Sequence, residues 1–359
     1  MSLSIGIVGL PNVGKSTLFN ALTGNNILAA NYPFATIEPN TGVVGVPDER
    51  LQKLAEIYNT QKIIPASVTF VDIAGLVSGA SKGEGLGNQF LGHIRSCNAI
   101  CHVVRAFSDN DVVHVDKLAD PKKDIEVINT ELLLADLQTV QKRLPLLEKE
   151  VRTNKKLQPV LDEVAKIKNL LEQGILLSQG KESIDFELVK DLHLITAKPM
   201  IYLFNVDEKV LTDEQKQTEL TQLVTPANCL FVCAKLENEL QGLDETDARE
   251  LLESYGVKES GIGQLAKIAY KTLDLQSFLT AGPKEVRAWT IRQGSSAPEA
   301  AGVIHGDFER GFISAQVVDY NDLITAGSWL AAKNNGKVRV EGKDYIMQSD
   351  DVVEFRFNV

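Results

Sequence analysis

The chain has 359 residues and a formal net charge of −11 at pH 7, with 44% hydrophobic and 24% charged residues. Such a composition is typical of a globular protein, and the length predicts two or three domains. The acidic balance argues against nucleic-acid binding over the whole surface, but it leaves room for a local basic patch. No apolar run approaches the roughly 18 residues of a membrane span and no signal peptide is visible, so we expect a cytoplasmic protein with no membrane partner.

A phosphate loop lies close to the N-terminus. The sequence of residues 9–16, GLPNVGKS, matches the pattern G-x-x-x-x-G-K-[ST]. An apolar run over 4–8 predicts a buried strand before it, and the pattern from Thr17 predicts a helix after it, which is the context such a loop requires. In this loop Lys15 is expected to reach the β- and γ-phosphates, and Ser16 to ligate Mg²⁺. The loop residues expected to contact the nucleotide are Asn12, Val13, Gly14, Lys15, Ser16 and Thr17.

A second phosphate-sensing element follows the predicted strand over 68–72, which ends in the pattern Asp-x-x-Gly. Here Asp72 is expected to hold Mg²⁺, often through water, and the N–H of Gly75 to contact the γ-phosphate. The turn-rich segment 31–40 lies between the two elements, and the hydroxyl of its Thr36 is expected to close over Mg²⁺ and the γ-phosphate. The predicted metal ligands are therefore Ser16, Thr36 and Asp72.

The base-recognition element differs from that of a standard GTPase. A predicted strand over 199–204 leads into the sequence NVDE, where GTPases carry Asn-Lys-x-Asp and the Asp accepts hydrogen bonds from guanine. Val206 replaces the Lys, and Glu208 extends its carboxylate one methylene too far, so the guanine-specific contact is lost. Asn205 and the backbone of Val206 remain to meet the N6 amine of adenine.

Together these motifs resemble the YchF, or Obg-like ATPase, family over essentially the whole chain. The resemblance rests on GLPNVGKST, NYPFATIEPN, DIAGLVSGASKGEGLGN and the Asn-x-x-Glu base motif, and the CAK sequence at 233–235 is similar to a Ser-Ala-Lys loop that closes over the base. It implies an α/β phosphate-loop NTPase of the Obg type that prefers ATP and associates with the ribosome. It also implies an inserted antiparallel α-helical hairpin and a C-terminal α+β β-grasp (TGS) domain. Asp207 leaves open a second register in which its carboxylate approaches the base, so nucleotide choice is less settled than phosphate binding.

The residue that orients the attacking water is not the usual Gln, because Leu76 follows the Asp-x-x-Gly pattern and an apolar side chain cannot orient water. His114 follows the carboxyl end of an apolar strand over 99–104, where open α/β sheets place their ligands, and the resemblance also favours it as the catalytic group. His102, within that strand, is expected to be a satisfied core residue. For Asn12 two hypotheses stay open, a ligand of K⁺ or a backbone cap of the loop.

A helical hairpin is predicted within the long segment at about 125–195. Apolar residues recur at alternating four- and three-residue steps over 133–151 and again over 160–171, as in two packed helices. The turn between them is expected at 153–158, and Pro145 is expected to kink the first helix.

The hairpin is basic although the chain is acidic. Its segment 142–168 has a local net charge of +4. The basic residues are Lys142, Arg143, Lys149, Arg152, Lys155, Lys156, Lys166 and Lys168, against Glu148, Glu150, Asp162 and Glu163. A charged helix surface is usually just solvated, but a projecting basic tip is also suited to RNA.

The pattern changes to short strands from about Leu279. The strands are predicted over 286–291, 312–318, 337–340 and 352–357, with one helix around 297–308. Strands around one helix predict a compact α+β domain, which the resemblance makes TGS, and the absence of a catalytic constellation favours a docking role. We therefore predict a nucleotide-binding domain over 1–278, with the hairpin inserted, and a TGS domain over 279–359.

Three functional hypotheses remain at this point. The leading one is an Mg²⁺-dependent ATPase with slow turnover, whose nucleotide states control docking of the hairpin and the TGS domain on the ribosome or RNA. The second is an Obg-type GTPase in which Asp207 or Glu208 still recognises guanine. The third is a nucleotide-gated binding protein with incidental turnover, which Leu76 keeps open.

Overall fold

The computed structural model describes residues 3–24, 40–73, 86–107, 120–180 and 184–358. It divides the chain into two compact units. The described residues of the first unit fall within 3–24, 40–42 and 69–265, and those of the second within 43–68 and 266–358. The units therefore divide at 265/266, and the second one also takes a segment from the N-terminal third of the chain. The functional boundary predicted at 278/279 stays a prediction.

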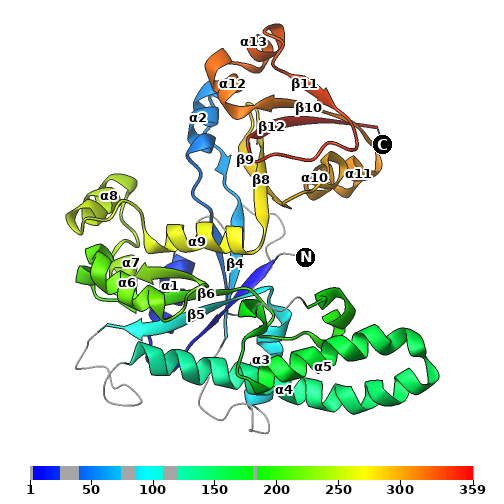
Figure 1. Cartoon of the computed structure of the whole chain (residues 1–359). Coiled ribbons are helices and arrows are strands. Elements are labelled where there is room, and N and C mark those ends of the chain that lie inside the picture. Colours follow the sequence, from blue (N-terminus) through cyan, green and yellow to red (C-terminus); the bar gives the residue numbers. More distant parts are fainter. Residues whose placement is uncertain (1–2, 25–39, 74–85, 108–119, 181–183, 359) are drawn as a thin grey trace. The chain divides into compact units, whose positions relative to one another are not determined.

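A six-stranded sheet in the order β2-β4-β1-β5-β6-β7 contains the strand that precedes the phosphate loop (Figure 1). Its strands are β1 (Ser4–Val8), β2 (Thr41–Gly45), β4 (Ser67–Asp72), β5 (Ala99–Ala106), β6 (Met200–Val206) and β7 (Asn228–Val232). Pairing is parallel from β4 through β1, β5 and β6 to β7. All seven residues of β6 are buried, as expected for a parallel strand covered on both faces.

The register brings the carboxyl ends of these strands to one edge of the sheet. Ile7 pairs with Asp72, Val8 with His102, and Asn205 with Val232. Ligands of open α/β sheets bind outside this edge, because the loops that leave the strands gather there. The loops after β1, β6 and β7 are therefore neighbours although they are far apart in sequence.

Helices flank this sheet and begin at recognisable caps. They are α1 (Lys15–Gly24), α3 (Leu86–Ser96), α6 (Glu214–Gln222), α7 (Ala234–Glu239), α8 (Glu245–Ser254) and α9 (Gly261–Thr272), with 3₁₀ segments at Leu177–Gln179, Phe186–Leu192 and Glu208–Thr212. Asp213 caps α6 and Asp244 caps α8 through side-chain bonds to backbone N–H groups. Glu237 is buried and accepts hydrogen bonds from the N–H groups of Gly261 (2.6 Å) and Ile262 (3.3 Å), which caps α9 in the same way.

The predicted hairpin consists of α4 (Pro121–Thr153) and α5 (Gln158–Glu172), joined through a 3₁₀ turn at Lys155–Leu157, and Figure 1 shows the two helices side by side. The predicted apolar seam forms its core, and both the turn and the start of the second helix lie where the sequence indicates. The helix α4 continues through Pro145, and the kink expected there stays a prediction. None of the helices in the described part of the chain combines the length and apolarity required to span a bilayer.

A buried carboxylate ties the hairpin to the sheet. Asp136 on α4 accepts hydrogen bonds from the N–H groups of Ile195 (2.9 Å) and Thr196 (2.7 Å) and from the Thr196 hydroxyl (2.7 Å). These residues lie in the segment that leads into β6. Burial raises the pKa of Asp136, and the three donors oppose that rise by stabilising the charged form.

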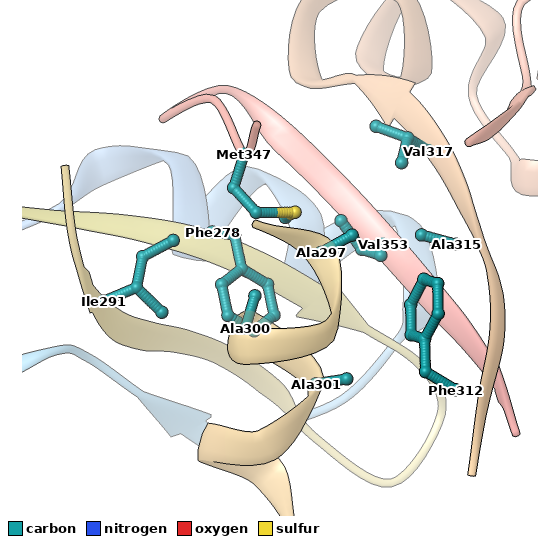
Figure 2. Packing of buried hydrophobic residues seen from close by; sticks show 10 residues of the cluster. All are labelled: Phe278, Ile291, Ala297, Ala300, Ala301, Phe312, Ala315, Val317, Met347 and Val353. Atoms are coloured by element: carbon teal, nitrogen blue, oxygen red, sulfur yellow. The ribbon is translucent and has the colours of Figure 1, made fainter. Parts of the chain in front are cut away.

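The second unit contains a mixed sheet in the order β11-β10-β12-β8-β9-β3. The strands are β3 (Ile63–Ile64), β8 (Leu275–Ala281), β9 (Val286–Arg292), β10 (Phe312–Asp319), β11 (Arg339–Glu341) and β12 (Asp351–Phe357). The helices are α2 (Glu49–Tyr58), α10 (Ala297–Ile304), α11 (Gly306–Arg310), α12 (Tyr320–Ala326) and α13 (Trp329–Asn334). Ala297, Ala300 and Ala301 form one small-residue face of α10, which lets the helix pack closely on the apolar face of the sheet (Figure 2).

The second unit departs from the sequence prediction in several places. The helix predicted around 297–308 is two helices divided at His305, and α12 and α13 were not predicted because helices of seven and six residues carry little periodicity. The segment 43–68 also joins this unit, since β3 pairs with β9 and Arg50 on α2 contacts Asp350 at 2.8 Å. Such long-range pairing leaves no local signal in the sequence.

Candidate functional site

The backbone conformation and close packing of the loop between β1 and α1 require glycine or asparagine at three positions. Gly14 has φ +90°, and a Cβ there would collide with Nδ2 of Asn205. A Cβ on Gly9 would lie 2.7 Å from the backbone oxygen of Val103. Asn12 has φ 63°, in the left-handed region that asparagine tolerates better than most residues. Glycine is thus required at positions 9 and 14 by the packing of the loop.

A cleft of about 810 Å³ opens beside this loop. The phosphate loop lines one end with Leu10, Pro11, Asn12, Gly14, Lys15, Ser16 and Thr17. The segments after β5, β6 and β7 line the other end with Phe107, Asn205, Val206, Asp207, Glu208, Cys233, Ala234 and Lys235. Most of the predicted phosphate-binding and base-binding residues thus line one cleft of a size suited to a nucleotide, whereas the predicted Val13 is buried and does not line it.

Lys15 lines the phosphate end of the cleft, and the charge of Asp72 is close enough to affect its pKa. Burial lowers the pKa of Lys15, and the charge of Asp72 opposes that change. Burial likewise raises the pKa of Asp72, and the charge of Lys15 opposes it. Each group is thus partly removed from water, which strengthens its interaction with a charged ligand.

The residues at this end fit Mg²⁺. Oδ1 of Asp72 is buried and has no hydrogen-bond partner among the described residues, so a metal-bound water or the ion itself would satisfy it. No group of three or more His, Cys, Asp and Glu side chains that could hold a metal occurs in the described part of the chain. Mg²⁺ is usually bound by one or two carboxylates together with substrate phosphates and water. Ser16 and Asp72 would hold the ion, which when bound neutralises charge on the phosphates.

Asn205 connects the two ends of the cleft. Its Nδ2 donates to the backbone oxygen of Val13 (3.0 Å), and its Oδ1 accepts from the N–H of Ala234 (3.1 Å). The side chain is buried, so both bonds are protected from water. These contacts give Asn205 a positioning role between the phosphate loop and the loop after β7. A direct contact with the base stays a prediction.

The base end differs from the phosphate end because charged side chains are exposed there. Val206 lines the cleft at the end of β6 and is almost fully buried. Glu208 and Lys235 form an ion pair at 3.3 Å, with side chains 30% and 74% exposed. The pKa of Glu208 is lowered, first by a hydrogen bond from its own backbone N–H and then by Lys235.

Comparison with known proteins decides the family. Two curated relatives named "Ribosome-binding ATPase YchF" align with the chain over its full length and theirs. The protein from Bacillus subtilis (strain 168) is 49% identical over 371 residues, and that from Haemophilus influenzae is 48% identical over 363. The chain belongs to the YchF family. The resemblance predicted from the motifs is therefore confirmed.

Two family models match parts of this YchF chain. Residues 4–143 match a model described as "50S ribosome-binding GTPase", and residues 275–358 match the YchF-type C-terminal model described as "Protein of unknown function (DUF933)". A solved structure titled "Structure of the Schizosaccharomyces pombe YchF GTPase" has a TM-score of 0.87 at 38% identity and covers 99% of this chain and 98% of its own. The predicted fold class, an α/β phosphate-loop NTPase with a helical hairpin and a C-terminal α+β domain, is confirmed.

Several predicted site residues of this YchF protein lie outside the described residues. These are Thr36, Gly75, Leu76 and His114. Their roles therefore stay predictions.

The described His102 corrects one expectation. It is buried as predicted, but neither ring nitrogen has a hydrogen-bond partner among the described residues, so it is not satisfied. Burial lowers its pKa to about 3, which keeps the ring neutral, and the ring lies 5.3 Å from that of Tyr202.

Leu10, Pro11 and Phe107 also line the cleft and were not predicted from the sequence. Phe107 follows β5 directly, and the guanidinium of Arg105 lies 4.4 Å from the centre of its ring. The available signal was position, because residues that follow a parallel strand lie at the ligand-binding edge of the sheet.

Proposed function

We propose that this YchF protein is an Mg²⁺-dependent ATPase that binds and hydrolyses ATP in preference to GTP. Its two nucleotide states control docking on the ribosome. The observation that carries the proposal is the single cleft that has Lys15 at one end and Glu208 at the other. A phosphate loop supports triphosphate binding in general, and the missing Asn-Lys-x-Asp motif supports adenine over guanine.

Hydrolysis in this proposal uses a group other than Gln, because Leu76 occupies the usual position. His114 orients the attacking water, and Lys15 stabilises charge on the phosphates. Asn12, which lines the cleft, either holds K⁺ or caps the loop. Intrinsic turnover is slow in this proposal, because the Gln that usually orients the attacking water is absent.

Docking in this proposal uses the tip of the hairpin and the C-terminal domain. Three basic residues of the hairpin are paired with carboxylates, in the pairs Arg143–Glu150, Lys166–Glu163 and Lys168–Glu172. Five others are exposed and form no ion pair among the described residues, namely Lys142, Lys149, Arg152, Lys155 and Lys156. Unpaired cations on a projecting element suit the phosphates of ribosomal RNA. The relatives' printed name, with the words "ribosome-binding", supports the same partner.

A GTPase is the second candidate, because the solved relative from S. pombe is titled a GTPase whereas the curated relatives are named ATPases. In that case Asp207 or Glu208 would recognise guanine. A third candidate, a nucleotide-gated binding protein with incidental turnover, predicts tight binding with negligible hydrolysis.

Titration of the purified chain with ATP and GTP, with and without Mg²⁺, tests the proposal. We expect tighter binding of ATP, dependence on Mg²⁺, and measurable phosphate release. Tighter binding of GTP would overturn the ATPase proposal, and binding without turnover would favour the third candidate.

Docking is tested by co-sedimentation with ribosomes after charge reversal at Arg152, Lys155 and Lys156. We expect weaker association with a flatter salt dependence, since each lost phosphate contact removes about one counterion from the slope. Charge reversal at Lys122, Arg249 and Lys258 is a matched control, because these residues are exposed, lie away from the tip and form no ion pair among the described residues. If ribosome association changes neither with the charge reversal nor with salt concentration, the hairpin tip is a solvated surface and not a docking site.

A further inference from the structure

An ion pair between Glu208 and Lys235 lies at the base end of the cleft. Lys235 is not part of the Asn-x-x-Glu base motif. Glu208 begins the 3₁₀ segment directly after β6, and Lys235 lies in the first turn of α7 directly after β7. Because β6 and β7 are adjacent parallel strands, the two side chains leave neighbouring strand ends and meet. The distance between Nζ of Lys235 and Oε1 of Glu208 is 3.3 Å, and both residues line the cleft.

The ion pair changes which hydrogen-bonding groups the cleft presents to a base. Guanine presents N–H donors on its N1 and N2 edge, whereas adenine has an acceptor at N1. A free carboxylate would accept from guanine, as the Asp of a GTPase does. Here the carboxylate of Glu208 already accepts hydrogen bonds from its own backbone N–H and from Lys235. The group that could favour guanine is therefore engaged elsewhere.

We propose that Lys235 is a specificity-determining positioning residue, which holds the carboxylate of Glu208 away from guanine and so lowers the affinity for GTP relative to ATP. This inference rests on the proposed function and deepens it. It differs from the length argument for Glu208, in which one extra methylene alone excludes guanine. If Lys235 instead holds the carboxylate, then removing Lys235 lets Glu208 accept hydrogen bonds from guanine again, at least in part.

The expected effect is modest because the pair is exposed. Lys235 is 74% exposed and Glu208 is 30% exposed, so solvent screens their attraction. Exposed ion pairs of this kind change equilibria by a factor of about two to five. The exposure also means that replacing Lys235 leaves the packed interior unchanged, which keeps the test free of folding defects.

The experiment measures the ratio of GTP affinity to ATP affinity for the full chain in Mg²⁺, by competition of each unlabelled nucleotide against a ribose-labelled ATP analogue. Lys235→Ala is expected to raise the ratio about three- to fivefold. Lys235→Arg, which keeps a cation in reach, is expected to restore the wild-type ratio. Lys209→Ala is the matched control, because Lys209 also carries a positive charge close to Glu208 but makes no hydrogen bond to it.

Repeating the Lys235→Ala substitution in a Glu208→Ala protein shows whether Lys235 acts through Glu208 or contacts the base itself. In a Glu208→Ala protein, adding Lys235→Ala is expected to leave the ratio unchanged, because no carboxylate remains to be released. An unchanged ratio in the single Lys235→Ala variant, or an equal shift in both backgrounds, would overturn the inference. The proposed function fails in a different way, namely if the unmodified protein binds GTP more tightly than ATP.

Discussion

The two ends of the nucleotide cleft are built in different ways. At the phosphate end, the binding groups are a tightly packed backbone and the buried Lys15, which is 9% exposed. At the base end, the lining residues include the ion pair of Glu208 and Lys235, whose side chains are 30% and 74% exposed. Packing constrains the phosphate end, whereas the exposed side chains of the base end can change without disturbing the core. We infer that phosphate binding is the less variable property of this site and that base choice depends on a few surface contacts.

The largest effect is expected for Lys15→Ala and Ser16→Ala. Each change removes a charge or a metal ligand that nothing nearby replaces, so Mg·ATP binding should weaken roughly 100-fold or more. GTP should be lost equally, because both nucleotides share the phosphates. Calorimetric titration measures both, with the exposed Lys216→Ala as control, and unchanged turnover in either variant would refute the site assignment.

His114→Ala is expected to reduce the turnover of ATP about 100-fold while the affinity for ATP stays near that of the unmodified protein. A group that positions water acts in the transition state and not on ground-state phosphates. Single-turnover hydrolysis and equilibrium binding measure the two quantities separately. If affinity falls as much as the rate, His114 has a structural role.

Asn205→Ala tests whether the two ends are coupled. The substitution leaves the backbone oxygen of Val13 and the N–H of Ala234 without their partner, at a cost of about 1–3 kcal/mol for each group. We expect ATP and GTP to weaken together, by roughly tenfold or more, since the change disturbs both ends. Asn238→Ala, on the exposed face of α7, is the control. Selective loss of one nucleotide would instead indicate a direct base contact by Asn205.

The smallest effect concerns the base end alone. Glu208→Asp together with Val206→Lys restores the reach of the carboxylate and the stem that covers the base. The affinity for GTP relative to ATP should rise about tenfold, the size of a charge-assisted contact. Competition titration measures the ratio. A much smaller shift would mean that the shape of the pocket near Cys233 decides the base.

Much of the fold was predictable because its signals are local. The strand over Ser4–Val8, the hairpin seam with Val140 and Val164, and the turn after Thr153 all depend on contiguous patterns. The short helices α12 and α13 were missed, as was the place of α2 and β3 in the second unit. The two helices are too short to carry a clear periodicity, whereas the placement of α2 and β3 depends on partners hundreds of residues away, as in the contact between Arg50 and Asp350.

The sequence by itself predicted the chemistry of the phosphate end. GLPNVGKS places its glycines, lysine and serine within eight contiguous residues, so the local backbone brings these groups together. Only the tertiary structure decided the contacts of Asn205, Glu208 and Lys235. Asn205 bonds to a residue 192 positions earlier, and Lys235 meets Glu208 across 27 positions. These contacts exist because parallel strands bring their carboxyl ends to one edge of a sheet, and no local pattern specifies which side chains then meet.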